Sequence, residues 1–184
     1  MDNVVVTGMQ RISVVGTSGS GKSTLARRIA DRLAVPYIEL DAIHHRPGWK
    51  AMSEKEFRAA VADRITGDTW VVDGNYFGKL GDLVWSRADT VVWFDLPRAL
   101  VMRQITARTL RRALTRRELW NGNREDLRNM VSLDPQRSVI VWAWQTHTAN
   151  RERYLTARHA PEYAHLRFVR LGSRRETDAF LGEL

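Results

Sequence analysis

The chain has 184 residues, 43% of them hydrophobic and 27% charged, and a formal net charge of +8. This length fits one sizeable core and not two typical domains, so we predict a single domain over residues 1–184. The absence of cysteine excludes disulfides and cysteine-bound zinc, and no apolar stretch is long enough to span a bilayer, so a cytoplasmic protein without membrane contact is expected.

A phosphate-binding motif follows the first predicted strand. Residues 12–15 form that strand and run into residues 16–24, which read G-T-S-G-S-G-K-S-T. Leu25, Ile29 and Leu33 then recur at helical spacing. A strand, a G-x4-G-K-[ST] loop and a helix form the arrangement in which backbone amides bind nucleotide phosphates. The alternative is a glycine-rich turn before an ordinary helix.

We therefore predict ATP and Mg²⁺ as cofactors. Lys22 is expected to reach the β- and γ-phosphates, and the Ser23 hydroxyl is expected to ligate the metal. The predicted nucleotide-binding residues of the loop are Gly16, Ser18, Gly19, Ser20, Gly21, Lys22, Ser23 and Thr24.

The next elements alternate between strands and helices. Residues 35–40 form a predicted strand that ends at Asp41. Ser53 and Glu56 have the spacing of a capping box, so a helix is predicted to begin there. Residues 69–72 form the third strand, which ends at Asp73.

The second half of the chain continues this alternation. Residues 90–94 are a fourth strand, residues 167–171 a fifth, and Ser173 begins the last helix. Residues 138–144 are rich in β-branched side chains, but the polar stretch that follows extends too far for a strand, so we predict a helix. Such alternation predicts a parallel sheet that is covered on both faces by helices.

The sequence resembles small adenylate-kinase-like P-loop proteins, and more narrowly those described as DNA topology modulation proteins. The resemblance covers nearly the whole chain. Besides the loop, it rests on L-D-A-I-H (40–44), R-P-G-W (46–49), V-D-G-N-Y (72–76), R-A-D-T (87–90) and F-D-L-P (94–97).

This resemblance implies a three-layer α/β/α P-loop NTPase fold with a five-stranded parallel sheet in the order 2-3-1-4-5. It also implies a helical lid at roughly residues 105–137 and an acceptor site beside the second and third strands. Adenylate kinases follow the aspartate and glycine of the third strand with an arginine for the acceptor phosphate. Here Asn75, Tyr76 and Phe77 follow instead, so AMP phosphorylation is not implied.

Two aspartates at strand ends are candidate functional groups. Asp73 is predicted to bind a metal-bound water, because similar kinases place an aspartate there. Asp41 points into the crevice where open α/β sheets bind ligands, and it could accept a proton from a substrate hydroxyl. The alternative for each is a helix cap or a turn residue.

An arginine-rich stretch follows the fourth strand. Nine arginines and three acidic residues lie between positions 98 and 128. We predict a lid that closes on the γ-phosphate, in which Arg108 and Arg112 share a helix face and the resemblance places Arg103 on adenine. The segment 120–123 is expected to expose Trp120 at the lid tip. A merely soluble basic helix and a nucleic-acid-binding surface are the alternatives.

Several side chains near the second and third strands are predicted to bind the acceptor. They are Asp41, His44, Trp49, Asp73, Asn75 and Tyr76. The adjacent histidines His44 and His45 are not expected to share a metal ion, because no further ligand lies at suitable spacing. Trp49 and Tyr76 could stack on a planar substrate or fill the core.

The pattern as a whole predicts an ATP-dependent kinase. Its partner would be a nucleotide, a nucleoside or another small hydroxyl-bearing metabolite. No Asn-Lys-x-Asp motif occurs, which argues against a GTPase. The alternative is a nucleic-acid-associated or regulatory ATPase whose basic lid contacts the phosphodiester backbone.

Overall fold

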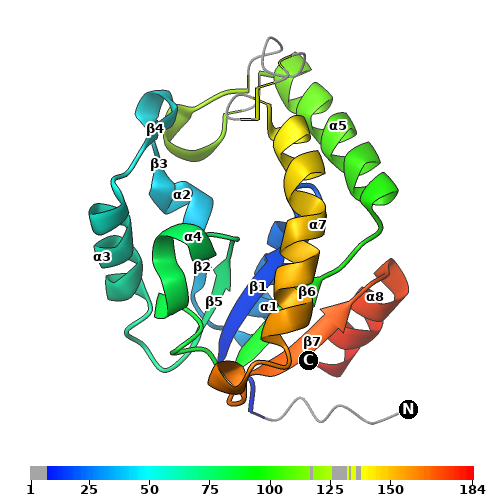
Figure 1. Cartoon of the computed structure of the whole chain (residues 1–184). Coiled ribbons are helices and arrows are strands. Elements are labelled where there is room, and N and C mark those ends of the chain that lie inside the picture. Colours follow the sequence, from blue (N-terminus) through cyan, green and yellow to red (C-terminus); the bar gives the residue numbers. More distant parts are fainter. Residues whose placement is uncertain (1–7, 117, 126–131, 133, 136–137) are drawn as a thin grey trace.

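Five parallel strands form the central sheet, in the order β2-β5-β1-β6-β7 (Figure 1). Their bounds are β1 Arg11–Gly16, β2 Tyr37–Glu39, β5 Trp70–Asp73, β6 Thr90–Phe94 and β7 Arg167–Leu171. The computed structural model describes residues 8–116, 118–125, 132, 134–135 and 138–184. Counted along the chain, these strands have the order 2-3-1-4-5, so the predicted topology is confirmed.

The middle of the sheet is buried on both faces. In β1, which lies between β5 and β6, the residues from Ile12 to Gly16 are all buried. Every residue of β5 and of β6 is buried as well. This is why the central strands read as nearly continuous apolar runs instead of alternating with polar residues.

One face of the sheet is covered by α1 (Lys22–Leu33), α8 (Arg174–Glu183) and the first turns of α5 (Arg98–Leu114). Leu25 and Ile29 of α1 lie one turn apart on one face of that helix and pack with Val14 and Val92 of the sheet. Phe180 of α8 belongs to the same cluster.

The opposite face is covered by α3 (Glu54–Arg64), α4 (Phe77–Leu80) and α7 (Val139–Ala157). Phe57 and Val61 of α3 pack with Trp70, and Tyr154 of α7 packs in the same cluster as Trp93. The sheet and its two helical coverings therefore form the predicted α/β/α layers.

The short elements are α2 (Leu40–His44), β3 (His45–Arg46), η1 (Pro47–Trp49), β4 (Lys50–Ala51), η2 (Gly81–Leu83), η3 (Trp120–Gly122) and η4 (Pro161–Tyr163).

Polar caps fix the start of three helices. Ser53 and Glu56 form the predicted capping box, and Ser173 accepts from the backbone N–H of Glu176. Ser138 likewise accepts from the N–H of Val141, so the ambiguous segment begins a helix, as predicted. Side-chain caps of this kind satisfy amides that have no partner inside the helix.

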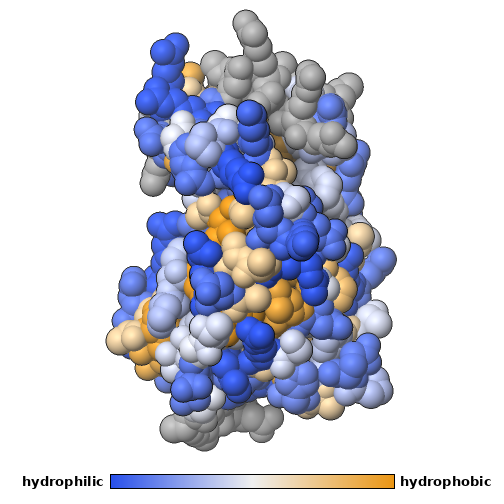
Figure 2. Space-filling view, turned by 90° about the vertical axis from the view of Figure 1, so that its left-hand side faces the viewer, coloured by the Kyte–Doolittle hydropathy of each residue, from blue (hydrophilic) through white to orange (hydrophobic). Residues whose placement is uncertain are grey.

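The helices α5 and α7 lie side by side and extend beyond the sheet, and η3, which follows α5, reaches back toward α2, β3 and η1 (Figure 1). Trp142 and Trp144 of α7 are both about half exposed, at 51% and 53%. Figure 2 shows the face that carries α3, where hydrophilic side chains predominate and hydrophobic ones gather across the middle. Over the described ranges, no helix has the length and apolar character needed to cross a membrane.

Candidate active site

The predicted phosphate-binding loop connects β1 to α1 at the carboxyl end of the sheet. Gly19 has a φ of 90°, a conformation that L side chains rarely adopt. A Cβ on Gly19 would lie 2.5 Å from the Cβ of Ile105 in α5, so no side chain fits between the loop and this helix. Gly21 is the N-cap of α1 without a side-chain cap, which leaves the first amides of the helix available to an anion.

Lys22 and Asp73 meet beside this loop. The Nζ atom of Lys22 lies 3.8 Å from Oδ1 of Asp73, and both side chains are buried. Tyr37 of β2 donates its hydroxyl to Oδ2 of the same carboxylate at 3.0 Å. Burial, and then the charge of Asp73, raise the pKa of Tyr37, so its hydroxyl stays protonated as a donor. The ammonium group of Lys22 therefore lies beside the phosphate-binding loop, where it is paired with Asp73.

The loop and its surroundings contain oxygen atoms that suit a metal ion. Oδ1 of Asp73 and Oγ of Ser20 are buried, and neither has a hydrogen-bond partner among the described residues. Buried polar atoms without partners are uncommon in proteins, and carboxylate and hydroxyl oxygens are ligands that Mg²⁺ prefers. Ser23 is half-buried in the first turn of α1, so these residues fit the predicted Mg²⁺–nucleotide complex.

Asp41 lies in the first turn of α2, directly after β2. The Tyr76 hydroxyl donates to its Oδ1 atom at 2.7 Å and lies 3.4 Å from Nε2 of His45. Burial, followed by the charge of Asp41, raises the pKa of Tyr76, which therefore remains a donor. Elsewhere in the described chain no hydrogen bond to the Asp41 carboxylate is found, so part of this carboxylate remains available to a substrate hydroxyl.

His44 is buried under the same helix. Its ring packs against Phe57 and Tyr76, and its Nε2 atom lies 2.9 Å from Nζ of Lys79. Burial, and then the positive charge of Lys79, lower the pKa of His44 to about 4. His44 is therefore neutral at pH 7 and accepts a hydrogen bond from the lysine.

This histidine should make stability depend on pH. Its pKa is about 6.5 in the unfolded chain and about 4 when folded, so its contribution is complete above the higher value and is lost as the pH falls between them. We expect the free energy of unfolding to fall by about 2–3 kcal/mol more in the wild type than in His44→Gln across this window. Urea titrations at several pH values measure it. His159→Gln, an exposed position, should behave as the wild type does, and equal pH profiles for all three proteins would contradict the prediction.

The lid arginines differ in their surroundings. Arg108 is half-buried on α5, and its Nε atom is buried without a partner in the described part of the chain. Burial and then Arg112 lower its pKa, while Glu125 and Asp41 raise it, so Arg108 lies within electrostatic reach of the Asp41 carboxylate. Arg112 instead forms an ion pair with Glu125 at 3.0 Å, and Arg103 is exposed. Roles for Arg103 and Arg112 on the nucleotide stay predictions.

The segment after α5 is docked onto the acceptor side. Asn121 donates to the backbone oxygens of Ala42 and His45, and Asn123 donates to that of Arg46. Trp49 returns two hydrogen bonds, from its backbone N–H to Asn123 and from its indole N–H to the Arg124 oxygen. We call these contacts the clasp.

The prediction of an exposed Trp120 at the lid tip is wrong. Trp120 is half-buried because its ring packs against His45, with centroids 6.0 Å apart, and against Trp49, at 6.3 Å. Its neighbour Trp49 is 39% exposed. The predicted lid, residues 105–137, lies partly outside the described residues, as do Arg117 and Arg128 of the arginine-rich stretch.

Asn75 occupies a position that the sequence did not indicate. Its side-chain amide pairs with both backbone groups of Gly16, and its Oδ1 atom also accepts from Tyr154. The amide therefore serves the loop, and its role in acceptor binding stays a prediction. Lys79, Tyr154 and the clasp asparagines were missed, because single polar residues on helices and turns carry no motif.

The loop, the strand order and the two helical layers together define the P-loop NTPase fold. A family model described as ATPase family associated with various cellular activities (AAA) matches residues 12–95. Among solved structures, shikimate kinase from Acinetobacter baumannii in complex with shikimate has a TM-score of 0.55 at 16% identity, over 94% of this chain and 89% of that one. Shikimate kinase from Bacteroides thetaiotaomicron has a TM-score of 0.50 at 14% identity, over 95% and 96%.

Curated relatives match only part of the chain. A bifunctional pantoate ligase/cytidylate kinase from Gloeobacter violaceus is 42% identical over 59 residues, which are 30% of this chain and 12% of that protein. A cytidylate kinase from Nitratidesulfovibrio vulgaris (strain Hildenborough) is 32% identical over 65 residues, 34% of this chain and 28% of that protein. The chain thus matches well under a third of the length of these relatives.

Proposed function

We propose that this protein is an ATP-dependent kinase that transfers the γ-phosphoryl group to the hydroxyl of a small acceptor. The observation that carries the proposal is that two pairs of charged side chains lie at the carboxyl ends of the strands. Lys22 and Asp73 meet at the loop, and Asp41, in the first turn of α2 after the neighbouring strand β2, lies within electrostatic reach of Arg108. The cytidylate kinase relatives support phosphoryl transfer to a small molecule.

One set of residues binds the phosphoryl donor, ATP, and another set binds the acceptor. Loop amides and Lys22 bind the β- and γ-phosphates, and the Ser23 hydroxyl and the Asp73 carboxylate would hold Mg²⁺ near them. The metal, when bound, neutralises negative charge on the phosphate oxygens. Phosphoryl transfer mainly requires such positioning and charge compensation from a protein.

The residues near the substrate hydroxyl include the group that takes up its proton. The acceptor oxygen forms a bond to the γ-phosphorus while the bond to the bridging oxygen of ADP breaks. The hydroxyl proton moves to Asp41, which Tyr76 holds in place by its hydrogen bond. Arg108 would stabilise charge on the transferred group, and in support its buried Nε atom has no hydrogen-bond partner in the described chain.

A screen of acceptors tests this proposal. Nucleosides, nucleotides and small hydroxyl-bearing metabolites are supplied with Mg-ATP, and ADP production is measured. We expect at least one acceptor to raise the rate, and Asp41→Asn to reduce the raised rate by about a hundredfold to ten-thousandfold. Asp63→Asn, an exposed position on α3, is the matched control and should leave the rate unchanged. A panel without any acceptor dependence would overturn the kinase proposal.

The finer likeness to DNA topology modulation proteins is a separate proposal. Arg103, Arg111 and Arg116 on or just after α5 are exposed, and this supports contact with a phosphodiester backbone. Binding of labelled DNA at increasing salt concentration tests it, since phosphate contacts give an affinity that falls steeply with salt. For the kinase itself, we propose a cytoplasmic location and a small-molecule partner.

A further inference from the structure

The start of the phosphate-binding loop is held by a side chain from a neighbouring strand end. Oδ1 of Asn75 accepts from the backbone N–H of Gly16 at 3.0 Å, and Nδ2 of Asn75 donates to the backbone oxygen of the same residue. A primary amide is suited to this pairing, because it offers one donor and one acceptor side by side.

This pairing continues the sheet where the backbone leaves it. Asp73, the last residue of β5, pairs with Val14, and the N–H of Gly74 donates to the Val14 oxygen at 3.2 Å. Beyond this point the Asn75 side chain takes the place of the next backbone partner of β1. On its other side Gly16 pairs with Phe94 of β6, and a Cβ on Gly16 would lie 2.8 Å from the Phe94 oxygen. Gly16 is therefore fixed between β6 and Asn75.

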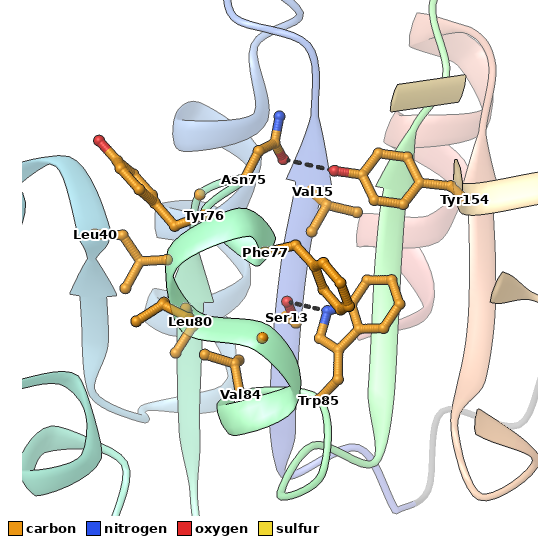
Figure 3. A pocket seen from close by; sticks show the side chains of 13 residues that line it. Ser13, Val15, Leu40, Asn75, Tyr76, Phe77, Leu80, Val84, Trp85 and Tyr154 are labelled. Atoms are coloured by element: carbon orange, nitrogen blue, oxygen red, sulfur yellow. Dashed lines mark hydrogen bonds between the residues drawn. The ribbon is translucent and has the colours of Figure 1, made fainter. Parts of the chain in front are cut away.

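Tyr154 of α7 orients this amide. Its hydroxyl donates to Oδ1 of Asn75 at 3.0 Å, as Figure 3 shows. Tyr154 is only 2% exposed, and its ring packs against Trp93 and Trp85 with centroids 5.5 Å and 6.2 Å apart. Burial raises the pKa of Tyr154, so the hydroxyl remains a donor. With two donors on Oδ1, the amide cannot turn over without losing both bonds.

A small cavity of about 30 Å³ lies below this pair, lined by Ser13, Phe77 and Trp85 among others (Figure 3). Its volume suffices for about one water molecule and not for a substrate. Asn75 and Tyr154 line this cavity too, and the contacts that the structure gives their polar atoms lead to the loop.

We propose that Tyr154 is a positioning residue of the nucleotide site, which acts through Asn75 on Gly16 and so links the helix returning from the lid to the phosphate-binding loop. This rests on the proposed function, because it assumes that the loop binds a nucleotide. Its consequence is that loss of the Tyr154 hydroxyl weakens binding of ATP and of ADP to the same degree, since the loop amides hold the β-phosphate that both share.

The test is calorimetric titration of Tyr154→Phe with Mg-ATP and with Mg-ADP, well below the unfolding temperature. We expect the Kd for both nucleotides to rise about fivefold to tenfold, the size of effect that one buried hydrogen bond gives. Tyr163→Phe is the matched control. The Tyr163 hydroxyl also donates to a side chain, Asp82 at 2.6 Å, and its ring also packs on Trp85, but it has no contact with the loop. Its Kd should stay unchanged.

A double-mutant cycle separates positioning from general stabilisation. If Tyr154 acts through Asn75, then Tyr154→Phe adds no further loss of affinity in an Asn75→Ala background. Two independent losses that multiply would overturn the proposal. So would a lower melting temperature of Tyr154→Phe with an unchanged Kd. Wild-type protein that gives no heat with Mg-ATP would instead refute the proposed function, and this inference with it.

Discussion

Replacement of Lys22 by methionine should reduce ADP production by about a hundredfold or more. The ammonium group of Lys22 is the buried cation beside the loop, and methionine keeps most of the volume of the side chain without the charge. Steady-state rates with a saturating acceptor measure the effect. Unfolding should be followed in parallel, because the substitution also leaves the buried Asp73 carboxylate without its ion pair.

Lys55→Met is the control for this substitution. Lys55 is exposed on α3, far along the chain from the loop, so its loss should change neither the rate nor the melting temperature appreciably. If Lys22→Met kept a rate close to that of the wild type while remaining folded, the loop would not be the donor site.

Replacement of Gly19 by alanine should abolish nucleotide binding and destabilise the protein by about 3 kcal/mol or more. The added Cβ would meet the Cβ of Ile105 at 2.5 Å, and the φ of 90° is unfavourable for alanine in any surroundings. Either the loop or α5 must therefore move. Denaturant unfolding and nucleotide titration together measure the two effects.

Gly78→Ala provides the matched comparison. Gly78 lies in α4, and a Cβ there would have no heavy atom within 4 Å, so alanine should be neutral or slightly stabilising. Gly19→Ala with wild-type stability and normal ATP affinity would show that the loop does not pack against α5 as described.

Most of the fold could be predicted from local sequence patterns. The capping residues Ser53 and Ser173 predicted where two helices begin, because a cap depends only on residues three positions apart. The predicted strand end at Asp73 is confirmed, since a buried run followed by a turn is itself a local signal, whereas β2 ends at Glu39, two residues before Asp41. The order of the strands came from the resemblance and not from any periodicity.

Contacts between distant segments were the part that could not be predicted. The bond from Asn75 to Gly16 spans 59 positions and that from Asn121 to His45 spans 76, so no spacing rule reveals them. The role of Arg112 on the phosphates stays a prediction, and its ion pair with Glu125 was not indicated by the sequence. An arginine-rich stretch predicts a positive surface but does not distinguish a side chain that faces a ligand from one that is neutralised by a nearby carboxylate.

The clasp has a consequence for the speed of the reaction. Asn121, Asn123 and Trp49 join the segment after α5 to the strand-end region that carries Asp41, by hydrogen bonds to main-chain atoms. On the proposed function, we expect a product bound beside Asp41 to leave only after those bonds have been exchanged for bonds to solvent. We therefore expect product release to limit the turnover rate. Substitutions that remove the hydrogen bonds of Asn121 and Asn123 would raise this rate and would also let more water reach the γ-phosphate.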